Sequence, residues 1–299
     1  MSTQASDGAA VATARKKFTL LDLAGRKADG RPITMLTAYD YSSALLVDRA
    51  GIDVLLVGDS LGMVMLGLES TVPVTMDEML HHCRAVARGA RLAFLVGDMP
   101  FLSYQADMAE AIRNAGRFLK EGGMESVKLE GGREVAATIE AIIAAGIPVM
   151  GHIGLTPQSI SKLGGYRVQG KTAAAAGRLL EDALILEQAG CYSVVLEAVP
   201  AAVAEAISVR LRIPTIGIGA GPGCDGQVLV YHDLIGLFDR FTPKFVRRYA
   251  EAGEVILGAL QRFAADVTNG VFPAAEHTYG MDEAELLAFR QQQLDAGRA

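Results

Sequence analysis

Residues 126–151 read SVKLEGGREVAATIEAIIAAGIPVMG and contain the repeating unit on which the fold prediction depends. The apolar run 126–129 predicts a strand, the pattern at 133–145 predicts a helix, and the run 147–151 predicts a second strand. Gly146 suits the end of the helix, where the backbone often turns left-handed. A strand, a helix and a strand in this order predict a parallel pair of strands, because a parallel crossover needs a long connection.

The same alternation continues through most of the 299 residues. Strands are expected at 33–38, 53–58, 92–97, 126–129, 147–151, 192–196 and 214–218, with a weaker eighth strand at 228–231. Helices are expected at 42–50, 76–90, 107–121, 133–145, 173–189 and 201–211. Eight strands without a second composition regime favour a closed (β/α)₈ TIM barrel of the α/β class, while an open doubly wound sheet remains the alternative.

The predicted organisation is one barrel domain with a short segment at each end. The barrel is assigned to residues 17–272, a length close to the roughly 250 residues that are usual for this fold. Residues 1–16 are interpreted as a flexible N-terminal arm, since they are mostly small and polar. Residues 273–299 are interpreted as a C-terminal extension with a helix at 283–294.

The composition excludes several classes of protein. Hydrophobic residues make up 51% of the chain, the formal net charge is −6 and the isoelectric point is near 5.5. This apolar content argues against disorder, and an acidic chain without a basic stripe argues against a nucleic-acid partner. The charge-free stretch 141–161 contains glycines and prolines that suit a strand with turns better than a membrane helix. A membrane partner is therefore not expected.

The cysteines indicate a reducing compartment. Cys83, Cys191 and Cys224 lie far apart, and no C-x-x-C pair exists, so neither a disulfide framework nor a zinc ribbon is expected. The first residues do not resemble a secretory signal, because the basic cluster follows them rather than preceding an apolar core. Together these features predict a cytoplasmic protein.

Ionisable residues follow one apolar run after another, where barrel strands are expected to end. These residues are Asp40, Asp59, Asp98, Lys128, Glu130, His152 and Glu197. In a parallel barrel, side chains at the carboxyl ends of the strands converge on one face. An aspartate in this position is also a common helix cap, and Asp40 fits that simpler interpretation. Asp59 and Asp98 do not directly precede a helical pattern, which favours a functional role for them.

Two of these residues, Lys128 and Glu130, are two positions apart on one predicted strand, so their side chains face the same way. Because an unpaired buried charge costs much free energy, they either form a structural ion pair or serve a ligand. Carboxylates from three neighbouring strands, at Asp59, Asp98 and Glu130, suit a hard divalent cation such as Mg²⁺. His152 is the histidine placed at the mouth, and a structural role for it competes with a catalytic one.

Two glycine-rich segments are weaker signals, each of which suggests a phosphate-binding loop. Residues 217–223 fail the pattern G-x-G-x-x-G, although a phosphate-binding loop or a tight turn stays open. Residues 165–172 read GYRVQGKT and match the P-loop pattern in full, with Lys171 as its lysine. No strand is expected directly before this segment, so the match is interpreted as chance and a nucleotide-binding module stays the minor alternative.

Several strings of residues resemble those of a known family, the ketopantoate hydroxymethyltransferases, also called 3-methyl-2-oxobutanoate hydroxymethyltransferases. The strings lie at 37–41, 56–62, 97–101, 127–132, 151–158, 164–170, 195–200, 216–221 and 225–227. The similarity is collinear from about residue 17 to 272. It implies a (β/α)₈ barrel that uses Mg²⁺, one per subunit, and 5,10-methylenetetrahydrofolate to convert α-ketoisovalerate to ketopantoate, on the route to pantothenate and coenzyme A. It also implies a homo-oligomer, commonly a decamer.

The resemblance also implies roles for individual residues. The metal ligands that it implies are Asp59, Asp98 and Glu130, and the contacts to the keto acid are Asp59, Ser60, Asp98 and Lys128. Glu197 is the implied proton acceptor, and Lys128 and His152 are further catalytic groups near the reacting end. Ala198 departs from the family in a position often held by cysteine. The nearest alternative is another Mg²⁺-dependent barrel lyase or mutase of α-keto acids, whose typical Lys-Lys-Cys-Gly-His loop is missing here.

Overall fold

The computed structural model describes residues 15–296, except the side chain of Leu163. In this part of the chain, parallel strands pair in chain order and the last strand pairs with the first, so the sheet closes into a barrel. The strands are β1 (Ile33–Thr37), β2 (Val54–Val57), β3 (Phe94–Asp98), β4 (Ser126–Glu130), β5 (Val149–Gly154), β6 (Ser193–Glu197), β7 (Thr215–Ile218) and β8 (Gly226–Leu229). The predicted (β/α)₈ barrel is confirmed, and the open doubly wound sheet is excluded.

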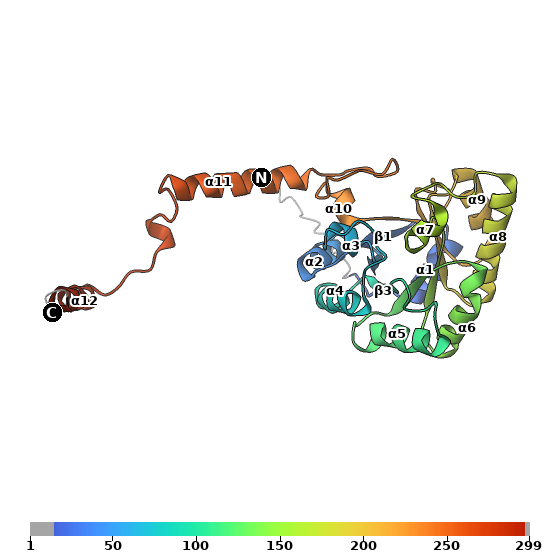
Figure 1. The fold of residues 1–299 in the computed structure, drawn as a ribbon, viewed down its shortest axis with the longest axis horizontal. Helices are drawn as coiled ribbons and strands as arrows, with labels where there is room; N and C mark the ends of the chain where they lie inside the picture. The colour runs from blue at the N-terminus through green and yellow to red at the C-terminus, as the bar shows by residue number, and fades with distance from the viewer. Residues whose placement is uncertain (1–14, 297–299) are drawn as a thin grey trace, which may run out of the picture. The chain divides into compact units, whose positions relative to one another are not determined.

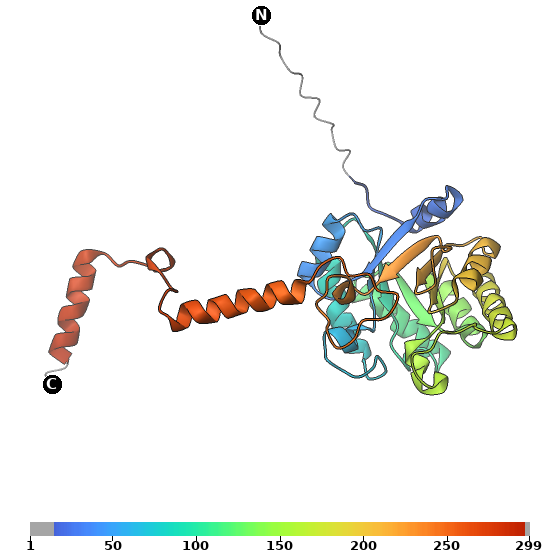
Figure 2. The same cartoon turned by 90° about the horizontal axis from the view of Figure 1, so that it is seen from above.

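The helices between the strands lie on the outside of the barrel, as both ribbon views show (Figure 1; Figure 2). The predicted ones are α2 (Tyr41–Arg49), α4 (Met76–Gly89), α5 (Met108–Lys120), α6 (Ala136–Ala144), α8 (Ala173–Gln188) and α9 (Ala201–Arg210). Local signals set their ends. Thr75 and Glu78 form a capping box at the start of α4, and Asp40 caps α2, as the simpler interpretation of that aspartate predicts.

The side chains inside the barrel come from alternate residues of the strands. Their apolar members form one buried cluster: Ile33, Met35, Val54, Leu56, Phe94, Val96, Met150, Val195, Ile216 and Val228. The same alternation continues to the carboxyl ends of β3 to β6, where the inward residues become polar. Strand periodicity therefore places Asp98, Glu130, His152 and Glu197 at one end of the interior.

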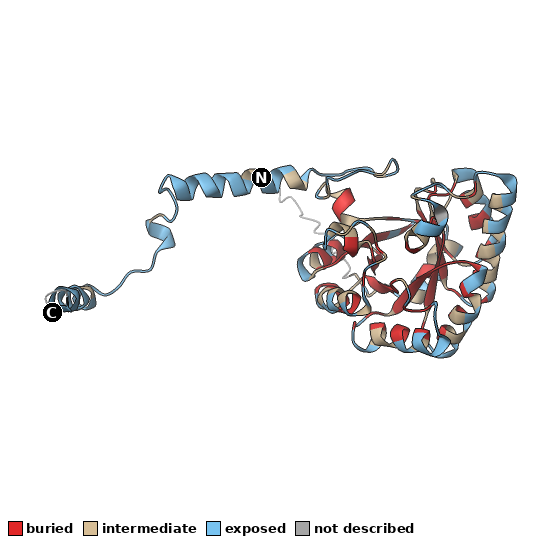
Figure 3. Ribbon diagram, in the orientation of Figure 1, coloured by how far each residue is buried: buried red, intermediate tan, exposed pale blue. Residues whose placement is uncertain are grey.

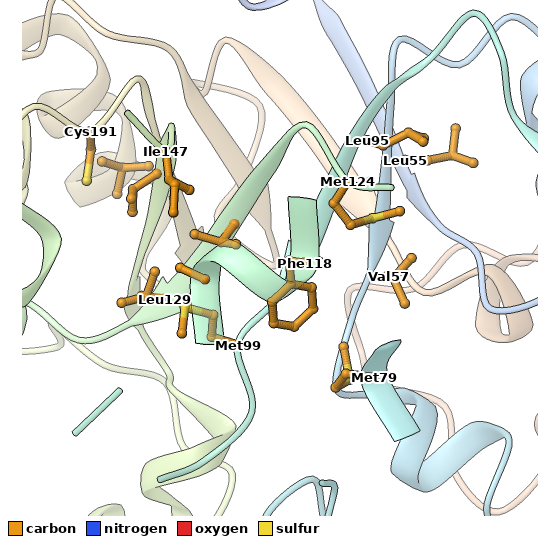
Figure 4. Close-up of a cluster of buried hydrophobic side chains, with 14 of the residues drawn as sticks. Leu55, Val57, Met79, Leu95, Met99, Phe118, Met124, Leu129, Ile147 and Cys191 are labelled. Atoms are coloured by element: carbon orange, nitrogen blue, oxygen red, sulfur yellow. The ribbon is translucent and has the colours of Figure 1, made fainter. Parts of the chain in front are cut away.

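The residues of the opposite register pack against the helices and form the outer layer of the core. Figure 4 shows part of this layer, with Val57 and Leu129 from the strands and Met79 and Phe118 from α4 and α5. All four side chains are fully buried. Full burial of such side chains contributes about 1.5–3 kcal/mol each to folding. This layer fixes the strands, and therefore the residues at their ends.

Helix α1 (Leu20–Ala28) and strand β8 differ from the sequence prediction. Helix α1 was not expected, although Thr19 and Asp22 form a capping box before it, and its Leu23 packs into the interior cluster. Strand β8 begins two residues before the predicted 228–231. At Gly226 an added Cβ would lie 2.6 Å from the carbonyl oxygen of Ile33, so a glycine, a weak strand former, occupies the place where β8 meets β1.

From Ala250 onward the chain forms a second compact unit, which contains α11 (Ala252–Thr268), a 3₁₀ turn (Ala275–His277) and α12 (Glu283–Ala296). Neither long helix has a buried residue, and both are drawn almost wholly as exposed in Figure 3. The sequence placed the end of the barrel domain at residue 272, but the first unit ends at Tyr249. The boundary at residue 272 came from the extent of the family resemblance, and no helix was predicted at 252–268. No helix within residues 15–296 has both the length and the apolarity needed to cross a membrane.

Candidate active site

A cavity of about 400 Å³ opens where the strands of the barrel end. All the site residues predicted from the sequence line it: Asp59, Ser60, Asp98, Lys128, Glu130, His152 and Glu197. These residues are separated by up to 138 positions in the chain and meet only because parallel strands end on the same face. The structure thus confirms that they are neighbours, while their individual roles remain predictions.

Asp98 and Lys128 form a buried ion pair at the centre of the site. They lie opposite each other on β3 and β4, with 2.8 Å between Oδ1 of Asp98 and Nζ of Lys128. Burial by itself lowers the pKa of Lys128, but the charges on Asp98, Glu130 and Asp59 outweigh it and raise that pKa above its ordinary value. Lys128 therefore stays cationic. The angle between the two groups is poor for a hydrogen bond, and Oδ1 of Asp98 accepts none from the described residues.

Asp59 follows β2 and lies beside the other two acids. Its backbone N–H donates to Oδ2 of Asp98 at 3.2 Å, and its Oδ2 accepts from Nε2 of Gln158 at 2.9 Å. Burial, together with the negative charges on Asp98 and Glu130, raises the pKa of Asp59 well above its usual range. This mutual repulsion is the electrostatic feature that distinguishes the site from an ordinary structural ion pair.

Ser60 directs its hydroxyl toward the buried Tyr39. It precedes the short helix α3 (Leu61–Val64), but its side chain makes no capping hydrogen bond. Instead, its Oγ lies 2.8 Å from the hydroxyl of Tyr39. The serine hydroxyl is thereby held at the wall of the cavity, next to Asp59.

His152 connects two carboxylates on neighbouring strands. Its Nε2 lies 3.2 Å from Oε2 of Glu197, and its Nδ1 lies 3.5 Å from Oε1 of Glu130 and 3.2 Å from Nζ of Lys128. Burial and the charge on Lys128 lower the pKa of His152, but its contacts with Glu130 and Glu197 prevail and raise it to about 9. Whether the ring is charged or neutral, these partners favour a proton on Nε2, facing Glu197.

Sequence reasoning did not single out the neutral residues that hold the carboxylates in place. Gln158, in the 3₁₀ turn after β5 (Pro157–Ser159), donates its backbone N–H to Oε2 of Glu130 at 3.0 Å and its side-chain amide to Asp59. Tyr104 accepts the backbone N–H of Glu130 at 3.1 Å. An amide or a phenol in a loop carries no spacing signal, so only the resemblance string at 151–158 pointed to this region.

A further residue next to the predicted base has an unusual backbone. Ala198 has a φ of 48°, in the left-handed region that residues with a Cβ seldom adopt. Its N–H donates to the carbonyl of Ile218, and its own carbonyl accepts from Gln169. These bonds hold the chain in this conformation as it turns out of β6, directly after Glu197. Strain of this kind is found most often at functional sites.

The structure contradicts the P-loop interpretation of residues 165–172 and shows close packing at residues 217–223. Residues 165–172 follow a short helix, α7 (Ile160–Leu163), rather than a strand, and Lys171 is exposed. In the segment 217–223 the glycines allow close packing: an added Cβ at Gly219 would lie 2.7 Å from the ring of Phe245. The P-loop match is therefore a coincidence of sequence, and close side-chain packing explains the second segment.

The donor set fits a divalent cation by its chemistry. The site brings together four carboxyl groups, of Asp59, Asp98, Glu130 and Glu197, and two basic groups, of Lys128 and His152. No group of three or more His, Cys, Asp and Glu side chains among residues 15–296 is already arranged to hold a metal ion. Mg²⁺ does not require such an arrangement, because it binds through one or two carboxylates and completes its shell with waters and substrate oxygens.

Comparison with known proteins agrees with this site. The family profile of ketopantoate hydroxymethyltransferase matches residues 17–275. The 3-methyl-2-oxobutanoate hydroxymethyltransferase of Syntrophus aciditrophicus is 58% identical over 264 residues, covering 88% of this chain and 97% of that protein. The enzyme of the same name from Nitratidesulfovibrio vulgaris is 55% identical over 291 residues, covering 97% of this chain and 95% of that protein.

Solved structures with the same fold are more distant in sequence. A phosphonopyruvate hydrolase in complex with oxalate and Mg²⁺ has a TM-score of 0.58 at 14% identity, covering 94% of this chain and 99% of the other. A 2,3-dimethylmalate lyase of the PEP mutase/isocitrate lyase superfamily has a TM-score of 0.56, also at 14% identity, covering 94% and 98%. These likenesses show the fold alone, whereas the profile and the close relatives show the family. The chain is an enzyme of the ketopantoate hydroxymethyltransferase family.

Proposed function

We propose that this enzyme transfers a hydroxymethyl group from 5,10-methylenetetrahydrofolate to α-ketoisovalerate (3-methyl-2-oxobutanoate), in a reaction that requires Mg²⁺ and gives ketopantoate. The observation that carries the proposal is one cavity in which Lys128 and the acids of β2 to β4 face the pair formed by Glu197 and His152. The family membership supports the same reaction. The proposed place of the reaction is the synthesis of pantothenate and coenzyme A in the cytoplasm.

Asp59, Asp98 and Glu130 would hold the metal ion. Oδ1 of Asp98, which is ion-paired with Lys128 but accepts no hydrogen bond from the described residues, supports this assignment. When bound, Mg²⁺ supplies Lewis acidity toward the substrate's keto group, which makes the neighbouring C3–H easier to remove. Lys128 would face the substrate's oxygens, where its fixed positive charge stabilises negative charge that develops on the keto oxygen. Ser60 would donate a hydrogen bond to the keto acid substrate.

Glu197 would accept the proton from C3. Its side chain is 16% exposed, so it reaches the open part of the cavity while His152 behind it is only 3% exposed. Nε2 of His152 lies 3.2 Å from the carboxylate of Glu197 without the geometry of a hydrogen bond, so the ring would orient that carboxylate through its charge. The C3 carbanion equivalent then forms a C–C bond to the methylene carbon of the folate, whose two C–N bonds break. Water supplies the hydroxyl oxygen, and tetrahydrofolate leaves with two protons on its nitrogens, one from C3 and one from water.

The direct test is formation of ketopantoate from α-ketoisovalerate and methylenetetrahydrofolate, with and without a chelator. The proton-transfer step is tested separately by exchange of the C3 hydrogen in deuterated buffer. Glu197→Gln should abolish exchange, whereas Glu140→Gln, a matched change on an exposed side chain of α6, should leave it unchanged. Exchange by Glu197→Gln at the native rate would show that the base is another residue.

The competing function is that of the Mg²⁺-dependent lyases and mutases of α-keto acids, which share the barrel. A requirement for folate discriminates between the two, because a lyase or mutase needs no one-carbon donor. The identity of more than half to hydroxymethyltransferases over most of the chain favours the transferase. Release of a keto acid product without folate would favour the lyase.

We also propose a homo-oligomer, commonly a decamer in this family. In the second unit, helix α11 carries a series of apolar residues that are at least 46% exposed: Val255, Ile256, Leu257, Leu260, Phe263 and Val267. Exposed apolar surface of this kind is typical of protein–protein contacts. Sedimentation of the full chain tests the proposal, and a monomer at micromolar concentration would contradict it.

A further inference from the structure

The outer part of the cavity has an acid that none of the proposed steps uses. Asp233, in the short helix α10 (Tyr231–Leu234) after β8, lines the cavity and is 9% exposed. Among the described residues, no donor forms a hydrogen bond or an ion pair with its carboxylate. The charge on Arg248 acts on it only enough to offset part of the effect of burial. An unpaired buried carboxylate costs free energy, and a ligand that donates to it recovers that loss.

The walls around this acid are aromatic. Phe238, Phe241 and Phe245 line the same cavity. The rings of Phe238 and Phe241 meet edge to face with their centroids 5.8 Å apart, and the ring of Phe245 packs on Gly219, whose lack of a side chain makes room for it. Aromatic walls with one acceptor at their edge suit a flat heterocycle that presents N–H groups.

The keto acid does not fit this end of the cavity. It is an anion, so the carboxylate of Asp233 repels it, whereas the buried cation Lys128 attracts it. The cavity therefore combines a charged centre at β2 to β4 with a part rich in aromatic side chains, to which the segment after β8 contributes Asp233 and Lys244.

We infer that Asp233 accepts the two N–H donors on the 2-amino-4-oxo edge of a pterin ring, which lies against Phe238, Phe241 and Phe245. This inference rests on the proposed function, in which a folate is the one-carbon donor. It deepens that function by assigning the pterin to the β8 side of the cavity. Two parallel donors on one carboxylate form a charge-assisted pair, which is stronger than neutral hydrogen bonds.

The test uses the full chain and two halves of the cosubstrate as probes in anaerobic calorimetry. 6-Methyltetrahydropterin carries the ring alone, and 4-aminobenzoyl-glutamate carries the remainder. Asp233→Asn should weaken binding of the pterin at least tenfold and leave that of the benzoyl probe unchanged, because a side-chain N–H₂ replaces one of the two acceptors. Asp239→Asn, a matched change on an exposed neighbour, should alter neither. Phe241→Leu should weaken pterin binding several-fold.

Equal binding of the pterin by the native protein and Asp233→Asn would overturn the inference. Guanine has the same donor edge, so guanosine is a second probe: tighter binding of guanosine than of the pterin, with the same dependence on Asp233, would assign the pocket to a purine and also overturn it. The proposed function fails separately, if the native protein neither exchanges the C3 hydrogen of α-ketoisovalerate nor forms ketopantoate. A melting temperature of Asp233→Asn at or above the native value shows that lost binding is not lost folding.

Discussion

Nζ of Lys128 lies 2.8 Å from Oδ1 of Asp98, and the two side chains are 4% and 2% exposed. The pair joins β3 to β4 at the point where the barrel interior changes from apolar to charged side chains. At this degree of burial each charge is stabilised by the other, because water cannot solvate either group if its partner is removed. The same two residues therefore contribute to the free energy of unfolding and to the proposed active site.

Removing the lysine should destabilise the barrel strongly. In Lys128→Met the free energy of unfolding should fall by about 3–5 kcal/mol, because buried carboxylates lose their cation. The double variant Lys128→Met/Asp98→Asn should lose less than the sum of the two single changes, as urea unfolding of all four proteins measures. Lys120→Met, at an exposed position of α5, is the control. Strict additivity would mean that the two groups do not interact in solution.

Mg²⁺ should stabilise the protein through Asp98. At a hundred times its dissociation constant, a bound ion adds about 2.7 kcal/mol to the free energy of unfolding, which raises the melting temperature by several degrees. Asp98→Ala should abolish this shift, while Asp266→Ala, on an exposed side chain of the second unit, should keep it. Calorimetric melting with Mg²⁺ and with a chelator measures the effect. The same shift in Asp98→Ala would place the metal elsewhere.

Gly154 is expected to be essential for the position of Glu197. Its φ is 96°, and an added Cβ would overlap the carbonyl oxygen of Glu197 on the neighbouring strand. Gly146 has a similar φ of 86° but nothing within 4 Å of its added Cβ. Both substitutions by alanine carry the left-handed penalty of about 1–2 kcal/mol. Gly154→Ala should lose about 1–3 kcal/mol more, from overpacking, together with most of the C3 exchange.

Urea unfolding and C3 exchange should be measured for both variants. Both share the strain of a positive φ, so the difference between them measures the effect of the contact between Gly154 and Glu197 alone. If Gly154→Ala and Gly146→Ala behave alike, the contact between β5 and β6 does not position the base.

Asp233 should make the protein less stable as the pH rises through its titration. Burial raises its pKa to about 6 from the 3.8 of a free aspartate, and the charge on Arg248 offsets only part of this. The folded protein thus binds the proton more tightly than the unfolded chain. The destabilisation is absent below about pH 4, grows as the pH rises to about 6, and is complete above that value.

Asp233→Asn should therefore raise the free energy of unfolding by about 2–3 kcal/mol near pH 8 and change it little near pH 4. Urea unfolding without ligands at the two pH values measures the difference, with Asp239→Asn as the control. An effect of equal size at both pH values would contradict the assigned titration. A gain in stability with a loss of pterin binding is the expected trade-off for a binding residue.

The sequence predicted the barrel well because its signals are local. Apolar runs such as 147–151 and helices such as 173–189 are visible without knowledge of any partner, and the structure places β5 and α8 within a few residues of them. Predictions failed where an element depends on what packs against it. Strand β8 begins with Gly226, which is required by the close approach of β1. Helix α1, which was not predicted, packs its Leu23 into the interior cluster.

The residues of the candidate site also fall into two groups, those that the sequence indicated and those that it did not. The charged residues at the strand ends stand out because a charge directly after a buried strand is unusual, and all of them except the helix cap Asp40 line the cavity. Gln158, Tyr104 and Asp233 were not singled out, since neutral groups and single acids outside the predicted strand ends are common everywhere on a protein surface. Their importance comes from burial and from partners distant in the chain.

The order of strands and helices, and the face on which the charged residues end, follow from the amino-acid sequence alone, because periodicity and strand direction are properties of neighbouring residues. Which oxygen faces which nitrogen, how tightly Gly154 approaches Glu197, and the burial of Asp233 without a partner are set only when the barrel closes. Closure removes water from these groups and fixes their distances, and electrostatic energies depend on both.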